Sequence, residues 1–338
     1  MMPISRTGKT GMPDSVFART GQDPMDSIKT NFSAMTALQS LQATNKDLLQ
    51  TQQRISTGYR VASAEDNAAY WSISTTMRSD NKALTTVMDA LGLGSATIDV
   101  AYTALTSSID VASEIKSKLV AARQPGVDRV RIQSEVTELQ NQLRSIADSS
   151  IFSGQNWLSV DSDAAGYNAT RSIVSSFSRA GDGTISIGTI TFSVDDSKLY
   201  DASATNDGIL DGLRDGTGAR SGAGTFTVST LNIAALTDSA GDLTTLEDYI
   251  RGVDASITEM TAAGTSLGST KQRIGLQQTF VKVLMDAIER GVSTLVDADM
   301  NEESTKLQAL QVQQQLGVQA LSIANSSSQN ILSLFRGG

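Results

Sequence analysis

The sequence predicts a mainly α protein, in which long helical arms from the two chain ends form an antiparallel helical bundle or coiled coil, with a small β-rich central insertion. Apolar residues recur at alternating spacings of three and four over long stretches near both ends, as they do on one face of a helix. Of the four prolines, only Pro125 follows Met25, so long uninterrupted helices are allowed. Glycine is concentrated between residues 161 and 242.

The N-terminal arm is expected to contain three helices. The apolar spacing predicts them over residues 31–57, 65–123 and 128–148. The second one ends at Pro125-Gly126, a pair that commonly follows the end of a helix.

The C-terminal arm is expected to contain two helices. The spacing holds over residues 243–295, which at about 1.5 Å per residue makes a helix on the order of 80 Å long. A last run extends from Leu307 to Phe335. Within the central insertion, Thr184–Val194 and Thr225–Ile233 alternate apolar and polar residues, which is typical of strands.

Composition excludes many kinds of chemistry. The 338 residues include no Cys and no His, so a thiol nucleophile, a thiolate metal site and a Ser-His-Asp triad are all impossible. We therefore expect no catalytic residues, no metal and no cofactor. The net charge of −9 without a basic cluster argues against a nucleic-acid partner. No apolar run approaches the roughly 18 residues of a membrane span, so membrane insertion is not expected.

The last helix carries two apolar stripes. The first stripe contains Leu307, Leu310, Gln314, Gly317 and Leu321, and the second contains Ala309, Val312, Leu316, Ala320 and Ile323. A helix that is apolar on two sides must be covered from two directions, and one partner helix in the same chain covers only one. We expect other copies of the chain to cover the rest. Identical copies joined by a contact that does not close form a helical filament.

Polar residues interrupt the predicted seam between the two outer helices. Asn45, Gln52 and Gln314 occupy seam positions, so this pairing is expected to be weak in a single chain. We therefore hypothesise that both ends fold only on assembly. The residues predicted to form these contacts, within the chain and between copies, are Leu38, Leu41, Leu48, Ile55, Leu307, Leu310, Leu316, Leu321, Ile323, Ile331 and Phe335.

Four segments resemble those of a known family. RISTGYR at residues 54–60 and VASAEDNAA at 61–69 resemble the N-terminal signature of bacterial flagellins. IFSGQNWL at 151–158 is similar to the turn that follows their second long helix, and residues 297–336 resemble their C-terminal helix. The resemblance implies a structural subunit that polymerises into the flagellar filament and serves swimming motility.

The resemblance also implies a division of the chain. Residues 25–60 with 296–338 would be inner-tube helices, and residues 61–160 with 243–295 the outer-tube bundle. Residues 161–242 would be a variable, surface-exposed β-rich domain. Residues 1–24 have no counterpart and are interpreted as a disordered leader or an artefact of the assigned start codon.

The implied partners are other copies of the chain, other flagellins, the flagellar type III export apparatus, an export chaperone, and the cap and hook-junction proteins. The implied location is extracellular, because flagellins are secreted into the filament. The N-terminus has no apolar signal region, so no cleaved signal peptide is expected.

Two alternatives remain at this point. A hook–filament junction protein has ends that resemble those of flagellin, although the long match at residues 297–336 favours the subunit. The second alternative is a flagellin that carries an enzyme in its surface domain. The absence of His excludes the zinc-peptidase form of such an enzyme.

Overall fold

The fold is that of a computed structural model, which describes residues 30–336, with side chains described up to residue 326. The chain divides into two compact units, one made of residues 1–67 with 296–338 and the other of residues 68–295. The leader proposed for residues 1–24, and the start at Met25, lie outside the described residues. The predicted fold class, helical arms around a small strand-containing insertion, is confirmed.

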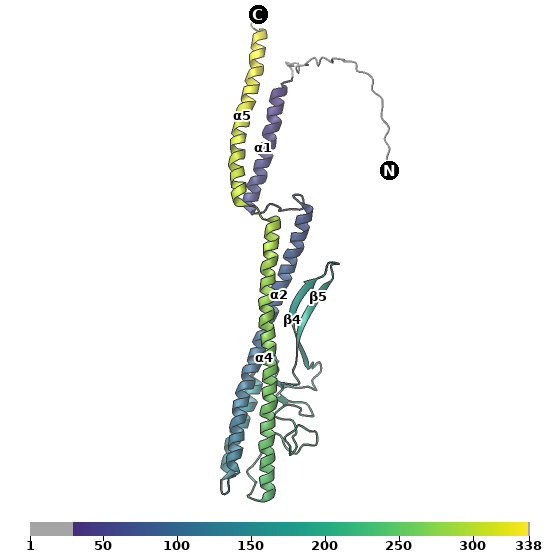
Figure 1. The fold of residues 1–338 in the computed structure, drawn as a ribbon, viewed down its shortest axis with the longest axis vertical. Helices are drawn as coiled ribbons and strands as arrows, with labels where there is room; N and C mark the ends of the chain where they lie inside the picture. The colour runs from purple at the N-terminus through teal and green to yellow at the C-terminus, as the bar shows by residue number, and fades with distance from the viewer. Residues whose placement is uncertain (1–29, 337–338) are drawn as a thin grey trace, which may run out of the picture. The chain divides into compact units, whose positions relative to one another are not determined.

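The first unit is an antiparallel pair of helices, α1 (Phe32–Thr57) and α5 (Met300–Arg336), which lie side by side in Figure 1. The side chain of Asn31 caps α1 by accepting a hydrogen bond from the N–H of Ala34. The helix ends at Gly58, whose φ of 75° is left-handed and whose N–H donates to the carbonyl of Arg54. Glycine favours this end because it has no Cβ to oppose that conformation.

The second unit is built on α2 (Ala68–Ala122), α3 (Arg129–Ser149) and α4 (Ala240–Val296). The predicted helices 65–123, 128–148 and 243–295 are thus confirmed to within a few residues. Helices α2 and α4 run antiparallel, and ion pairs such as Lys271–Asp99, at 2.6 Å, connect them in one register. The apolar core between the helices includes fully buried residues at heptad spacing, among them Leu91, Ile98, Leu105, Ala112, Leu119, Val253, Met260, Leu267 and Ile274.

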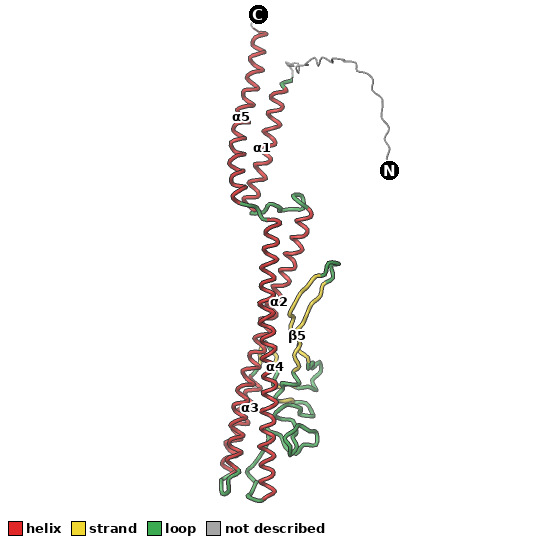
Figure 2. Tube along the Cα trace, viewed as in Figure 1, coloured by secondary structure: helices red, strands yellow, loops and turns green. Residues whose placement is uncertain are grey.

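The insertion contains one extended hairpin and mostly loops elsewhere, as the green segments of Figure 2 show. Strands β4 (Thr170–Arg179) and β5 (Ile185–Ser193) pair antiparallel, with a bulge between Val174 and Ser176. The remaining strands are two residues each: β1 (Ile151–Phe152), β2 (Gln155–Asn156), β3 (Ser159–Val160) and β6 (Tyr200–Asp201). Strand β5 confirms the prediction at residues 184–194.

The predicted strand Thr225–Ile233 is wrong, because these residues form turns and loops. Side chains of α3 satisfy the backbone here in place of a neighbouring strand. Gln140 donates to the carbonyl of Val228 at 2.9 Å, and Gln133 accepts from the N–H of Ile233 at 2.8 Å. The apolar side chains of this segment are nevertheless buried. Its alternation of apolar and polar residues therefore reflects side chains packed against a helix, not strand pairing within a sheet.

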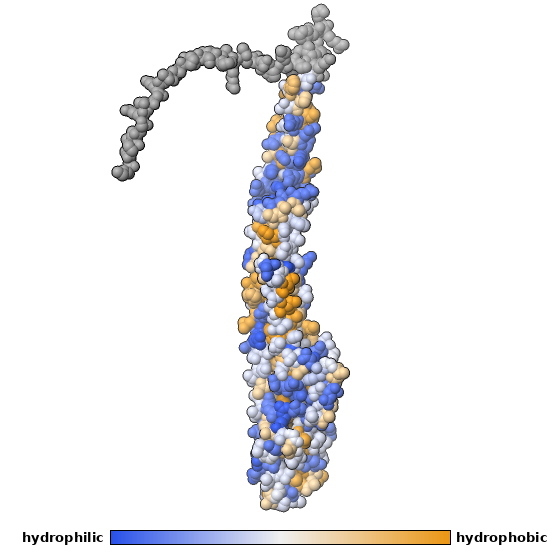
Figure 3. Space-filling view, turned by 90° about the vertical axis from the view of Figure 1, so that its right-hand side faces the viewer, coloured by the Kyte–Doolittle hydropathy of each residue, from blue (hydrophilic) through white to orange (hydrophobic). Residues whose placement is uncertain are grey.

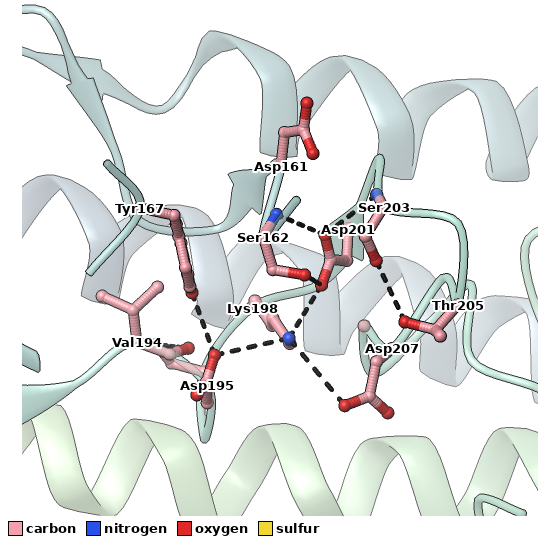
Figure 4. Close-up of polar contacts among 12 residues, drawn as sticks. Asp161, Ser162, Tyr167, Val194, Asp195, Lys198, Asp201, Ser203, Thr205 and Asp207 are labelled. Atoms are coloured by element: carbon pink, nitrogen blue, oxygen red, sulfur yellow. Dashed lines mark hydrogen bonds and ion pairs between the residues drawn. The ribbon is translucent and has the colours of Figure 1, made fainter. Parts of the chain in front are cut away.

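A buried lysine lies among three carboxylates of the insertion. Lys198 lies among Asp195, Asp201 and Asp207, with its Nζ 2.8 Å from a carboxylate oxygen of Asp201 (Figure 4). Both Lys198 and Asp201 are buried. Burial alone would raise the pKa of Asp201, but hydrogen bonds from Lys198 and Ser162 hold that pKa well below its usual range. The cluster therefore stabilises the insertion through a paired buried charge.

Candidate assembly site on the terminal helices

Three contacts set the register between α1 and α5. Near one end, the Nδ2 of Asn31 donates to the carbonyl of Ala324 at 2.9 Å. Further along, Gln314 donates to the side-chain oxygen of Asn45 at 2.7 Å. Between them, Leu41 lies so close to Gly317 that a Cβ there would be 3.1 Å from its Cδ1. All three contacts correspond to one antiparallel alignment of the two helices.

The other end of the pair is closed by an ion pair and a short backbone bridge. Arg54, in the last turn of α1, donates to a carboxylate oxygen of Glu303 at 3.1 Å. The Glu303 side chain is only 9% exposed, so this charge pair is shielded from water more than a surface pair. Tyr59 and Asp297 then form an antiparallel bridge, and the N–H of Ala298 donates to the carbonyl of Gly58 at 2.9 Å.

The turn after this bridge is held by Asp66. Its Oδ2 accepts hydrogen bonds from the N–H groups of Ala62 and Ser63, both at 3.0 Å. The bond from Ser63 is the main reason that the pKa of Asp66 is lowered. Val61 is buried beside the turn. The segment RISTGYR–VASAED therefore consists largely of residues that close the α1–α5 pair.

The predicted contact residues lie on two sides of the helices. Those that face the partner helix are buried or half-buried, namely Leu41, Leu48, Ile55, Leu307, Leu310 and Leu321. Leu38, Leu316 and Ile323 are exposed, by 44%, 57% and 69%. The side chains of Ile331 and Phe335 lie outside the described residues, although both belong to α5.

The second stripe of α5 is uncovered within the chain. Val312 is 55% exposed, and Leu316 and Ile323 are more so; Ala309 and Ala320 are exposed as well. Figure 3 shows apolar surface (orange) interrupting the polar surface along the helices. Because an isolated large apolar side chain is common on a surface but a continuous stripe is not, this face can bury more area only against another molecule.

Sequence reasoning missed three large apolar side chains that are exposed on α1. Phe32, Met35 and Leu49 are 56%, 57% and 65% exposed. Their letters are visible in the sequence, but they lie off the seam that defined the helix. A groove of about 550 Å³ lies between α1 and α5, and it is lined by Phe32 and by small residues such as Ala37, Gly317 and Ala320. The open groove adds to the surface available to a neighbour.

The contacts described at this site are those of packing: apolar stripes, a polar seam and one shielded ion pair. Among the side chains that the structure describes, no group of three or more acidic residues is placed to hold a metal ion. No helix in the described part of the chain combines the length and the apolarity that crossing a membrane needs.

Comparison with known proteins gives the family. Residues 28–163 match the family model of the bacterial flagellin N-terminal helical region, and residues 250–335 match that of the C-terminal helical region. Flagellin C of Rhizobium meliloti (strain 1021) is 49% identical over 326 residues, covering 92% of this chain and 100% of that protein. Flagellin A of Rhizobium meliloti is 42% identical, with the same coverage. A flagellin of Brucella melitensis is 43% identical, covering 93% of this chain and 100% of that protein.

Proposed function

The chain belongs to the bacterial flagellin family and is a structural subunit of the flagellar filament, not an enzyme; we propose that α1 and α5 are the surfaces on which its copies join. The observation that carries this proposal is the exposed second stripe of α5, residues Ala309 to Ile323. One side of α5 already packs on α1 through Leu310 and Gln314. In the filament, a neighbouring copy of the chain covers the exposed second stripe of α5.

The proposal also assigns each segment of the chain to a layer of the filament. Residues 25–60 and 296–338 form the inner tube, residues 61–160 and 243–295 form the outer tube, and residues 161–242 are exposed on the filament surface. In support, the structure separates into compact units whose boundaries fall after Asn67 and before Val296. Further support comes from the loop-rich insertion, because loops are found at surfaces and tolerate variation.

Secretion and the accessory partners complete the proposal. We infer export of the subunit through the flagellar type III apparatus, with the help of a chaperone, and incorporation under a cap beyond the hook-junction proteins. Support comes from the absence of Cys in the sequence, since disulfide formation cannot trap a chain that must pass the apparatus unfolded. Co-assembly with other flagellins is also open to this surface.

The test is growth of filaments from purified full-length chain on filament seeds, followed by electron microscopy. We expect Leu316→Asp and Ile323→Asp, which place a charge on the second stripe, to abolish growth. Gln315→Asp places the same charge on an exposed polar position of α5 and should grow as the parent does. Normal growth of both stripe variants would overturn the proposal.

A further inference from the structure

The outer face of α4 carries a second apolar patch, far along the chain from the terminal helices. Leu276, Phe280 and Val283 are 73%, 58% and 59% exposed, and their spacing of four and three places them on one face of the helix. We call these three residues the α4 knob. Leu276 and Val283 lie about 140–180° around the helix from the fully buried Ile274 and Val281, and Phe280 lies about 100–120° from them. The knob therefore lies outside the face that meets the core of its own unit.

The knob is a local feature of an otherwise polar face. Along the same side of α4, the exposed residues before it are Thr265, Ser269 and Gln272, and after it come the small Ala287 and then Arg290 and Thr294. The composition of this face therefore changes only where the knob begins and ends. An amphipathic helix with a purely solvated outer face would continue with polar residues, so this patch needs an occupant.

A hollow lies elsewhere on the same unit. It has a volume of about 400 Å³ and lies between α2 and β4, with Ala90, Leu93, Gly94, Thr97, Arg171 and Ile173 among its lining residues. We call this the α2–β4 hollow. Leu93 at its rim is 54% exposed, whereas Leu91, two residues earlier, is fully buried. The hollow is therefore open to solvent beside Leu93, while its lining includes Ile173 of the apolar core.

Knob and hollow lie at the same height along the α2–α4 pair. Asp99 and Lys271 form an ion pair across the two antiparallel helices at 2.6 Å. Leu93 lies shortly before Asp99, and Leu276 lies shortly after Lys271, so the two leucines are nearly level. A knob and a hollow at equal height but at separate places on one unit form a contact that can repeat from copy to copy without closing.

The hollow also offers a chemical partner for an aromatic ring. The Nε of Arg171 is buried there and has no hydrogen-bond partner among the described residues. A guanidinium attracts the face of an aromatic ring placed over it, and Phe280 is the one aromatic side chain of the knob. A volume of about 400 Å³ exceeds many times the roughly 30 Å³ of one water, so it has room for that ring and a leucine.

We propose that the α4 knob of one subunit inserts into the α2–β4 hollow of a neighbouring copy in the filament. The occupant is a second copy because the family assembles from copies of itself and because one chain carries both complementary surfaces at one height. The inference rests on the proposed function, and it adds a lateral contact within residues 68–295 to the contacts made by α1 and α5.

The chain contains no Cys, so introduced cysteines report this contact without background. The test chain carries Phe280→Cys with Leu93→Cys, one on α4 and one on α2, at positions whose native side chains are exposed. A bond within one chain would not join two subunits, so it adds nothing to an oligomer ladder. The matched control carries Phe280→Cys with Thr75→Cys, an exposed α2 position about 27 Å from residue 93 along the helix. Each double-cysteine chain is grown into filaments in two ways, as the sole subunit and as a minority in a mixture with the parent chain. Both kinds of filament are then oxidised.

We expect a ladder of disulfide-linked oligomers from the 93–280 filaments and dimers from the minority mixtures, with neither from the control nor from free subunits. Filaments that electron microscopy shows to be intact but that give no 93–280 bond would overturn the knob contact and leave the proposed function standing. Equal ladders from test and control would also overturn it. Failure of the parent chain itself to form filaments would instead overturn the proposed function.

Discussion

Gln314 of α5 donates a hydrogen bond to the side-chain oxygen of Asn45 in α1, with 2.7 Å between the two atoms. Two amides thus occupy a seam position where apolar side chains would bury more area. A polar pair at such a position fixes register and reduces stability, because any slip leaves both groups unpaired. The pair therefore makes the α1–α5 contact selective and weak.

The first prediction concerns this polar pair. Replacing both residues, Asn45→Leu with Gln314→Leu, should stabilise the paired helices by about 1–2 kcal/mol, since two leucines bury apolar area and no polar group is left unpaired. Gln314→Leu alone should destabilise the pair by about 1 kcal/mol, because Asn45 loses its donor. Thermal dissociation of filaments grown from each chain and from Asn45→Leu alone, followed by helical circular dichroism, measures these effects in the state in which the two helices are paired. A double replacement whose effect equals the sum of the effects of Asn45→Leu and Gln314→Leu alone would show that the two amides are not coupled.

The second prediction concerns the free subunit. Fully or nearly buried side chains are few in α1, where only Leu48 and Thr51 qualify, whereas α2 buries many. Amide hydrogens of residues 32–57 and 300–336 should therefore exchange much faster in the free subunit than those of residues 84–119, and become protected in the filament. Hydrogen exchange with mass spectrometry gives this comparison within one sample. Strong protection of the terminal helices before assembly would contradict the hypothesis that they fold on assembly.

Most of the helical architecture could be predicted because its cause is local. The three-and-four spacing of apolar residues persists through α2 and α4, and few prolines interrupt it. The two stripes of α5 were visible for the same reason, and the structure leaves the second one exposed. A period in the sequence reports which sides of a helix are apolar, so stripe residues such as Leu316 could be named in advance.

The rest depends on contacts between residues far apart in the sequence. The predicted strand at Thr225–Ile233 was wrong because Gln133 and Gln140, on another helix, satisfy its backbone. The ion pair between Arg54 and Glu303 was not predicted either, since charge at a helix end has several possible partners. The knob on α4 was not predicted either. Its three apolar residues lie off the regular heptad seam and are too few to form a periodic pattern of their own.

The third prediction tests the close approach of α2 and β4. A Cβ added at Gly94 would lie 2.6 Å from a methyl carbon of Ile173, a distance that forces one of the two elements to move. Gly94→Ala should destabilise the second unit by about 1–3 kcal/mol through overpacking, offset in part by the better helix propensity of alanine. Adding Ile173→Ala should remove the overpacking. Denaturant unfolding of the two variants and of Ile173→Ala alone provides a double-mutant cycle. Additive effects would mean that the cost of adding a methyl group at position 94 does not depend on the Ile173 side chain.

The fourth prediction concerns the buried lysine. Lys198→Met removes the cation beside Asp201 and leaves that carboxylate buried without its partner, which should destabilise the insertion by about 3–5 kcal/mol at pH 7. Trp157 is buried and stacks on Phe192, with ring centroids 5.5 Å apart, so its fluorescence reports unfolding of this region. The chain has one other tryptophan, and Trp71→Phe in all variants leaves Trp157 as the single reporter.

The pH dependence separates a charge effect from a packing effect. With Lys198 present, the pKa of Asp201 is lowered; the stability it contributes is present above its unfolded pKa of about 4 and is lost as the pH falls below that value. Replacing Lys198 removes the largest of the effects that lower this pKa, and we expect burial, the largest effect that raises it, then to bring the pKa above its unfolded value. The carboxyl of the variant then takes up a proton more readily in the folded state, so its deficit should be largest at pH 7 and shrink toward pH 4. The double variant Lys198→Met with Asp201→Asn has no carboxyl at position 201 that could titrate. Its stability deficit relative to the parent should therefore not shrink between pH 7 and pH 4. A deficit in Lys198→Met that stays constant from pH 7 to pH 4 would mean that the lysine acts through packing of its methylene chain alone.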